Sequence, residues 1–395
     1  MMLKEGKKEK IIGLAILIVV VIAVVVIKGV MDNKSGKNLT IIYGAVGGGK
    51  EDFLADEKFN EILQDKYKIK FVADSWGNGS TIKKPLVRES VHYGNTDIPE
   101  SELSVNNDRC SKYDLLFTSD ERYLNYYRRV PESGEAERYR VLKGSLTLNT
   151  PIVFYSWDTV VDALIKENIV TNENGIYYIT DPIKLIDYIL AGKSWKDIGL
   201  NDLFGKINIS SVDPVSSSPG ATYYGLLLTI MTNGSENEQD IEKVLPKLKQ
   251  LYDKSGYMGI TPADLFEKFM KIGKGTYPLI VDYEKSLMEF RNRDKEGYEN
   301  VKKSLRILYS KPTVTNSHCI ATFNEKGNEL LKAFDDKDIQ NLAWKNYGFR
   351  VSGTGGSSDV DVVDMPGIPS QISSGAKGLK METYNRLIEY LDKGV

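Results

Sequence analysis

An uncharged hydrophobic segment near the N-terminus, Ile11 to Ile27, constrains this chain more than any other feature. Lysines stand on both sides of the segment, and mostly apolar residues continue it to Met31. A helix of about 20 apolar residues crosses the hydrocarbon core of a bilayer, and the extended segment has this length. We therefore predict a transmembrane anchor over residues 11–31, with a cytoplasmic tail at 1–10 and a polar linker at 32–38.

The flanks of this segment favour an anchor over the alternative, a cleaved signal peptide. Signal peptides usually have a shorter apolar region that ends in a small-residue cleavage site, and no such site lies between Val24 and Gly36. Lysines are slightly more numerous before the segment than after it, so the positive-inside rule favours a cytoplasmic N-terminus. We expect a single-pass protein of the cell membrane whose soluble part is extracellular.

The composition excludes several classes of function. The chain is 41% hydrophobic and 27% charged with a net charge of −2, which is typical of a globular protein with a real core. The near balance of charge argues against nucleic-acid binding, which needs a strongly basic face, so we expect no nucleic-acid partner. The chain has only two histidines, His92 and His318, which excludes a histidine-rich metal site. His318 and Cys319 are adjacent and would point apart on a strand, so we expect no metal and no cofactor. The two cysteines are Cys110 and Cys319. The cysteines could form one disulfide or stay buried thiols.

Predicted strands and helices alternate along the soluble part of the chain. This alternation indicates an α/β protein with mostly parallel sheets. The predicted strands are 39–43, 69–73, 113–117, 150–157, 207–211 and 277–283, followed by an extended segment at 305–322 that only Pro312 interrupts. The predicted helices are 51–67, 119–126, 158–167, 182–191, 221–232, 241–252, 261–270, 284–291, 325–334, 336–345 and 380–392.

Two long extended segments, 150–157 and 305–321, divide the soluble part into three blocks. The outer blocks would form one lobe and the middle block another, because the chain would cross between them along these segments. This division assigns residues 39–150 and 309–395 to lobe 1 and residues 151–308 to lobe 2.

A glycine-rich segment after the first strand is similar to a nucleotide-binding loop. Residues Gly44 to Lys50 fit the first seven positions of a P-loop, but the eighth position, which should hold magnesium through Ser or Thr, is Glu51. A carboxylate at that position would repel phosphates. No G-x-S-x-G, CxxC or HExxH motif is present either, so we predict a protein without enzymatic activity, and a nucleotide-dependent hydrolase is the less favoured alternative.

Small polar groups follow several predicted strands, at the edge where open α/β sheets place their ligands. Backbone amides at helix starts add partial positive charge there, which suits a polar or anionic ligand. Each serine could instead be a simple helix cap, and the glycines a tight turn. Four such loops favour a cleft lined by hydroxyls and amides. The residues are Gly47, Gly48, Ser75, Thr118, Ser119, Ser216, Ser217, Ser218 and Thr222.

Several segments, in this order, resemble type II extracellular solute-binding proteins of the phosphate/molybdate-binding kind, in a membrane-anchored branch. The segments are 191–200 (AGKSWKDIGL), 203–206 (LFGK), 213–222 (DPVSSSPGAT), 277–290 (YPLIVDYEKSLMEF), 308–317 (LYSKPTVTNS) and 327–331 (GNELL). The resemblance implies two α/β lobes that close on a small polar or anionic solute and present it to an ABC permease or a membrane sensor. It also implies that the nine residues above, together with Tyr283, contact the ligand.

The sequence departs from this family pattern in two places. Residues 47–50 (GGGK) replace the usual Gly-Ser turn and remove a hydroxyl, and the polar insert 77–109 has no counterpart. A two-lobe scaffold that has lost its ligand therefore remains an alternative, as does a sugar ligand that stacks on Trp76, Tyr223 or Tyr224.

Overall fold

The computed structural model describes residues 39–75, 113–128, 140–256, 258–259, 261–351, 367–372 and 375–394. The predicted anchor at 11–31, the polar insert at 77–109 and Cys110 lie outside these residues. Within the described part of the chain, no helix combines the length and the hydropathy that crossing a bilayer requires.

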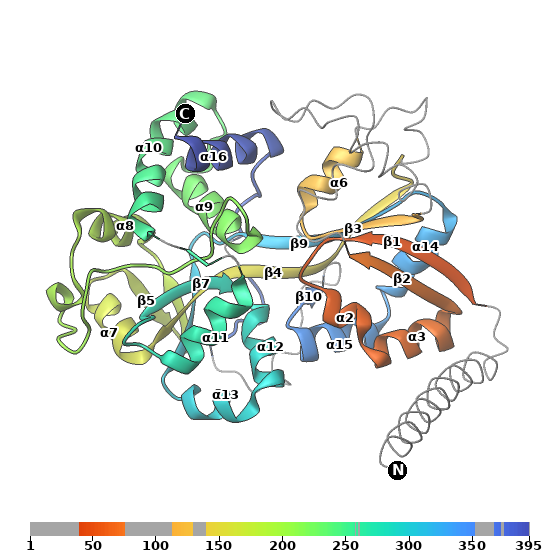
Figure 1. Ribbon diagram of the computed structural model, residues 1–395, viewed down its shortest axis with the longest axis horizontal. Coiled ribbons are helices and arrows are strands. Elements are labelled where there is room, and N and C mark those ends of the chain that lie inside the picture. Colours follow the sequence, from red (N-terminus) through yellow and green to blue (C-terminus); the bar gives the residue numbers. More distant parts are fainter. Residues whose placement is uncertain are drawn as a thin grey trace, which may run out of the picture.

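The molecule consists of two lobes that lie side by side and are joined by long strands (Figure 1). The strands that the structure describes form one connected sheet with the order β2-β1-β3-β9-β4-β8-β6-β5, and β10 and β7 pair with β4 off this path. Each lobe has its own hydrophobic core, one built around Phe53 and Phe117 and the other around Tyr155 and Trp195.

The first lobe is a β-α-β unit completed by strands and helices from the later chain. β1 pairs in parallel with β2 and β3, as the sequence predicts, and four aromatic rings pack beneath them. Its elements are β1 (Thr40–Val46), α2 (Glu51–Ala55), α3 (Glu57–Tyr67), β2 (Ile69–Ser75), β3 (Leu115–Thr118), α6 (Glu121–Tyr127), α14 (Glu325–Ala333), α15 (Lys337–Tyr347) and β10 (Arg350–Val351).

The second lobe surrounds α9, a helix that is buried on all sides. Its elements are α7 (Asp158–Lys166), β5 (Val170–Glu173), β6 (Ile176–Ile179), α8 (Pro182–Ala191), the 3₁₀ helix η2 (Trp195–Ile198), α9 (Ser218–Met231), α10 (Glu238–Ser255), α11 (Pro262–Ile272), β7 (Leu279–Tyr283), α12 (Lys285–Arg293), α13 (Lys295–Val301) and β8 (Leu305–Ser310). The last helix, α16 (Met381–Lys393), packs on α10 and α9, so the chain ends on this lobe although the sequence division groups it with lobe 1.

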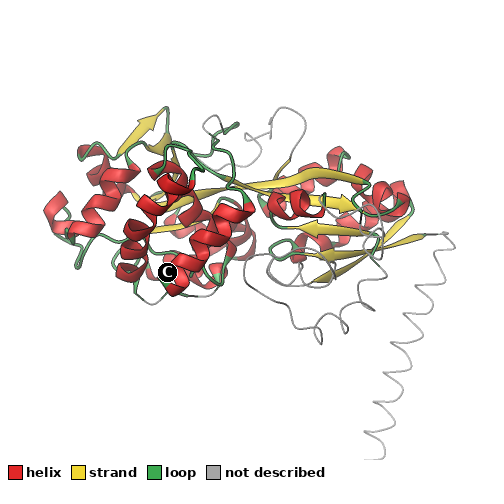
Figure 2. Cartoon of the chain, turned by 90° about the horizontal axis from the view of Figure 1, so that it is seen from above, coloured by secondary structure: helices red, strands yellow, loops and turns green. Residues whose placement is uncertain are grey.

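Two antiparallel strands cross between the lobes, as Figure 2 shows from above. β4 (Lys143–Trp157) pairs with β9 and β10 in its first half and with β7 and β8 in its second half. β9 (Thr315–Thr322) begins after a cis peptide bond at Lys311–Pro312, where the sequence predicts the break. The crossing strands therefore connect the two lobes.

The prediction of mostly parallel sheets is wrong, because the sheet is mixed. Six of the nine strand pairs among the described residues run antiparallel. One reason is the pair of crossing strands: β4 enters the second lobe, whereas β8 and β9 return from it and therefore run opposite to β4. β7 and β10 also pair antiparallel with β4. Alternation of strands and helices in the sequence does not reveal this reversal.

Two local predictions also differ from the structure, and one local element is not predicted. The helix expected at 51–67 is broken at Asp56, whose Oδ1 accepts a hydrogen bond from the Phe59 amide (3.1 Å) and starts α3. The strand expected at 207–211 is reduced to a single bridge between Ser210 and Ile280. The hairpin β5–β6 is not predicted, although its turn has Gly175 at φ +86°, a conformation that favours glycine.

Candidate functional site

Three of the predicted site residues meet where β7 ends. The hydroxyl oxygen of Tyr283, the last residue of β7, lies 2.9 Å from Ser218 Oγ and 3.0 Å from Thr222 Oγ1. Ser218 and Thr222 stand four residues apart near the start of α9, so they share one face of the helix. Burial raises the pKa of Tyr283 above its usual range, which keeps its proton available for these hydrogen bonds. We name Tyr283, Ser218 and Thr222 the hydroxyl cluster.

The serines just before α9 fold their own loop instead of joining the hydroxyl cluster. Ser216 Oγ donates to Asp213 Oδ2 (3.1 Å), and the Ser217 amide donates to the Asp213 carbonyl (2.9 Å). Ser217 is buried at the N-cap and caps no amide with its side chain. The contacts of these two residues help to position the start of α9.

Gly220 lets the start of α9 lie against the preceding loop. A Cβ on Gly220 would be 2.2 Å from the Val212 carbonyl oxygen, and both this atom and the next closest one belong to the backbone. Because the backbone cannot move aside as a flexible side chain can, only glycine fits here. The close contact sets the position of Ser218 and Thr222 relative to Tyr283.

Replacing Gly220 with alanine is expected to lower the free energy of unfolding by about 1–3 kcal/mol, the usual cost of overpacking. Gly275→Ala is the matched control, because a Cβ there meets no atom within 4 Å. Urea denaturation of both variants measures the difference. Equal stability of the two variants would show that the contact with Val212 is not tight in solution.

The glycine-rich turn after β1 already holds an anion, which is the chain's own carboxylate. Glu51 Oε2 accepts hydrogen bonds from the amides of Gly49 (2.7 Å) and Lys50 (2.9 Å), and Gly49 has φ +85°. The Gly47 amide donates to the Phe117 carbonyl at 2.8 Å. Two amides of the turn that was expected to bind a ligand are therefore already hydrogen-bonded to Glu51.

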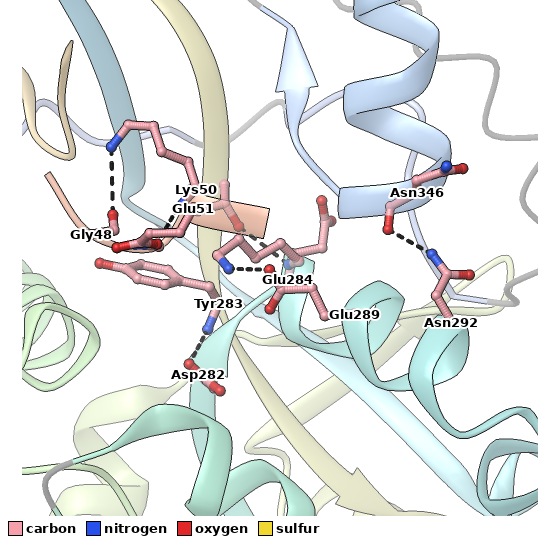
Figure 3. Close-up of polar contacts among 12 residues, drawn as sticks. Gly48, Lys50, Glu51, Asp282, Tyr283, Glu284, Glu289, Asn292 and Asn346 are labelled. Carbon is pink, nitrogen blue, oxygen red and sulfur yellow. Dashed lines mark hydrogen bonds and ion pairs between the residues drawn. The ribbon is translucent and has the colours of Figure 1, made fainter. Parts of the chain in front are cut away.

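Lys50 points back into this turn, as Figure 3 shows. Its Nζ donates to the Gly47 carbonyl (2.6 Å) and lies 4.9 Å from the centre of the Phe117 ring. Burial lowers the pKa of Lys50 to about 7, and the nearby cation Lys285 contributes in the same direction. A P-loop lysine has to reach outward to a phosphate, and this lysine does not.

The structure places the remaining predicted residues at the ends of β2 and β3. Ser75 ends β2, where it pairs with Val46, and the structure does not describe its side chain. Thr118 is fully buried and its Oγ1 donates to the Asp120 carbonyl (2.8 Å). Ser119 follows as a partly exposed residue. Thr118 thus shapes the loop that leads to Asp120 and α6.

A small cavity of about 40 Å³ lies next to the hydroxyl cluster, and residues from both lobes line it. Of the ten predicted site residues, only Thr222 lines this cavity. The lining residues are Asp120, Glu121 and Arg122 of the first lobe; Ala221, Thr222, Gly225 and Thr229 of α9; Val314, Thr315, Asn316 and Ser317 at the start of β9; and Gly378, Leu379 and Tyr384 near the C-terminus.

Sequence reasoning missed most of these residues for two reasons. Asp120, Glu121 and Arg122 directly follow the predicted Thr118 and Ser119, so the rule that places ligands after strand ends could have included them. Tyr384 contacts the guanidinium group of Arg122, with 3.5 Å between the ring centre and Cζ, although the two residues are far apart in the sequence. No pattern in the sequence reveals that contact.

A buried ion pair fixes the chain where β7 leaves the second lobe. Glu284 is fully buried, and its carboxylate accepts from Arg350 Nε (2.6 Å), Arg350 Nη2 (2.8 Å) and the Tyr309 hydroxyl (2.5 Å). The hydroxyl of Tyr155 donates to the carbonyls of Tyr283 (2.9 Å) and Glu284 (3.0 Å). These contacts tie β4, β7, β8 and β10 together, and they hold the backbone of Tyr283 in place.

Among the described residues, four buried side chains carry polar atoms that lack a hydrogen-bond partner: Asp282, Ser310, His318 and Trp344. Two of them, Asp282 and His318, are titratable. Burial raises the pKa of Asp282 to about 6 and lowers the pKa of His318 well below its usual value, so His318 is neutral.

In the described part of the chain, no group of three or more His, Cys, Asp or Glu side chains could hold a metal ion. Cys319 is a buried free thiol there.

Comparison with known proteins reveals the fold. No family model and no curated protein matches the sequence. An extracellular solute-binding protein from Bordetella parapertussis superimposes with a TM-score of 0.52 at 14% identity, covering 89% of this chain and 96% of that one. Iron-bound HitA from Pseudomonas aeruginosa gives a TM-score of 0.54 at 11% identity, covering 89% and 99%. This is the fold of solute-binding proteins.

At identities this low, the similarity shows the fold alone. Each of the two solute-binding neighbours covers 89% of the chain, so the match includes residues of both lobes. The expectation of an α/β solute-binding architecture is confirmed, whereas the neighbours do not reveal which ligand this chain takes.

Proposed function

We propose that this chain is a membrane-anchored extracellular solute-binding protein that captures a small polar solute between its lobes. The observation that carries the proposal is the cavity beside the hydroxyl cluster, because both lobes and the crossing strand β9 line it. Ligand sites of two-lobed proteins commonly lie at such domain interfaces. The shared fold of solute-binding proteins supports the same conclusion.

The crossing strands give the proposed capture a mechanism. The lobes are joined by β4 and β9, and the cavity lies against the start of β9, so a rotation about these strands would open or close it. A bound solute would contact both lobes only in the closed form and would therefore stabilise it. The closed form would then dock on an ABC permease or a membrane sensor.

The finer parts of the proposal come from the sequence. The N-terminal segment 11–31 would hold the protein in the cell membrane with its lobes outside, and residues 151–308 would form lobe 2. On the motif resemblance, the chain would belong near the phosphate/molybdate-binding branch. The ten predicted residues, from Gly47 to Tyr283, remain proposed contributors, and Thr222 and Tyr283 have the strongest geometric support.

Removing the hydroxyl of Tyr283 is expected to weaken solute binding by up to about tenfold, because Thr222, which lines the cavity, then loses the hydrogen bond that holds its side chain in place. The full-length wild type in detergent is first titrated by calorimetry with a panel of oxyanions, amines, amino acids and sugars. The tightest binder is then titrated into Tyr283→Phe. Tyr188→Phe is the control, because its hydroxyl contacts Glu167 on the surface of the second lobe.

If Tyr283→Phe binds as tightly as the wild type, the hydroxyl cluster takes no part in binding. If no member of the panel binds the wild type, capture itself is contradicted. That second outcome would favour a two-lobe scaffold without a ligand. One observation supports this alternative: Glu51 already accepts hydrogen bonds from amides of the glycine-rich turn.

A further inference from the structure

The geometry points to a positively charged solute: the cavity between the lobes receives an ammonium or similar cationic group, with Glu121 as its counter-charge. This inference rests on the proposed capture of a solute and adds the charge of that solute. It differs from the sequence-based expectation of a polar or anionic ligand.

The only cationic side chain that lines the cavity is already neutralised within the described part of the chain. Arg122 Nε donates to both carboxylate oxygens of Asp120 (2.8 and 3.0 Å), and its Nη2 also contacts Asp120. One face of its guanidinium group lies on the Tyr384 ring. The charge of Arg122 is therefore neutralised by Asp120, and its guanidinium group is poorly placed to bind an anion.

Glu121 is the charge that remains. It begins α6, is partly buried, lines the cavity and has no hydrogen bond or ion pair with any described residue. Two carboxylates and one guanidinium group give the cavity lining one net negative charge. A partly buried carboxylate without a partner favours a nearby cation and repels an anion, more strongly than it would in bulk water.

A second polar group at the cavity is also unpartnered. Asn316 at the start of β9 is only 5% exposed, and its side chain makes no hydrogen bond to a described residue. Buried amides are normally hydrogen-bonded, so this one is available to a ligand. Thr222 adds a hydroxyl oxygen from α9.

Together these groups match the donors of an ammonium group. An ammonium group has three N–H donors and no acceptor. The cavity offers the Glu121 carboxylate, the Asn316 amide oxygen and the Thr222 hydroxyl oxygen as acceptors. A volume of about 40 Å³ has room for about three water molecules, which suits a head group of a few heavy atoms.

Calorimetry on the full-length chain tests this inference with small probes of different charge: methylammonium, ethanolamine, acetate and inorganic phosphate. We expect the two amines to bind and the two anions not to bind. Glu121→Gln, which keeps the shape of the side chain and removes its charge, should weaken amine binding at least tenfold. Glu61→Gln on the exposed face of α3 is the matched control and should change nothing.

The other outcomes are distinct. Binding of acetate or phosphate without the amines would overturn the assigned charge while leaving solute capture intact. Amine binding that Glu121→Gln does not weaken would place the cation elsewhere and overturn the site. If no probe and no member of the wider panel binds, both the charge and the proposed function fail. Thermal melting of both variants shows whether they are folded.

Discussion

Replacing Arg350 with methionine is expected to lower the free energy of unfolding by about 3–5 kcal/mol. The reason is the carboxylate that the substitution leaves behind. Glu284 is 0% exposed, and without Arg350 only the Tyr309 hydroxyl contacts its charge among the described residues. The substitution also removes the donors that reach the carbonyls of Pro369 (2.8 Å) and Ser370 (3.2 Å).

Urea denaturation of the full-length chain measures this effect. Lys247→Met is the matched control, because it breaks an exposed ion pair with Asp187 (2.7 Å), and such pairs contribute about 1 kcal/mol or less. The double variant Glu284→Leu/Arg350→Met should be more stable than the single Arg350 variant, since no buried charge is left alone. A loss in Arg350→Met no larger than in Lys247→Met would contradict the role of this junction.

Lys50 is expected to make the protein more stable as the pH rises from about 7.5 to 9.5, by about 1.4 kcal/mol per pH unit. Its pKa is about 7 in the folded protein, whereas a fully solvated lysine, as in the unfolded chain, has a pKa of 10.5. Between these two values the unfolded chain binds a proton that the folded protein does not bind. Raising the pH therefore favours the folded state, and the cost of burying Lys50 is absent above pH 10.5 and complete below pH 7.

Lys50→Met tests the prediction. The variant should be more stable than the wild type near pH 7.5, and its stability should depend less on pH, by about 1.4 kcal/mol per unit. Lys58→Met on the exposed face of α3 is the control and should keep the wild-type slope. Parallel pH profiles for Lys50→Met and the wild type would mean that Lys50 is charged in the folded protein. In that case its buried position beside Lys285 and Cys319 would need another explanation.

The fold was largely predictable because most elements carry local signals. The helix predicted at 182–191 matches α8, whose N-cap Asp181 and C-cap Gly192 are ordinary boundary residues. The break at Pro312 between β8 and β9 was visible for a similar reason. The strand directions were not predictable, since β4 takes its neighbours from segments more than 100 residues away.

The site was predictable only in part. The rule on strand ends led to Ser218 and Thr222, the family resemblance added Tyr283, and the structure brings these three together. The sequence predicted that the Glu51 carboxylate would repel phosphates, but not that it would accept hydrogen bonds from the amides of Gly49 and Lys50. Hydrogen bonds of this kind depend on a single rotamer, which no sequence pattern specifies.

The most direct test of the account is the distance between the two lobes with and without solute. Spin labels at Glu61→Cys on α3 and Lys243→Cys on α10 mark exposed positions of the first and second lobes, in a chain whose Cys110 and Cys319 are replaced by serine. Pulsed electron paramagnetic resonance measures the distribution of distances between the two spin labels. We expect the tightest binder of the solute panel to narrow and shorten this distribution. An identical distribution at saturating solute would contradict a protein that captures its ligand by closing two lobes.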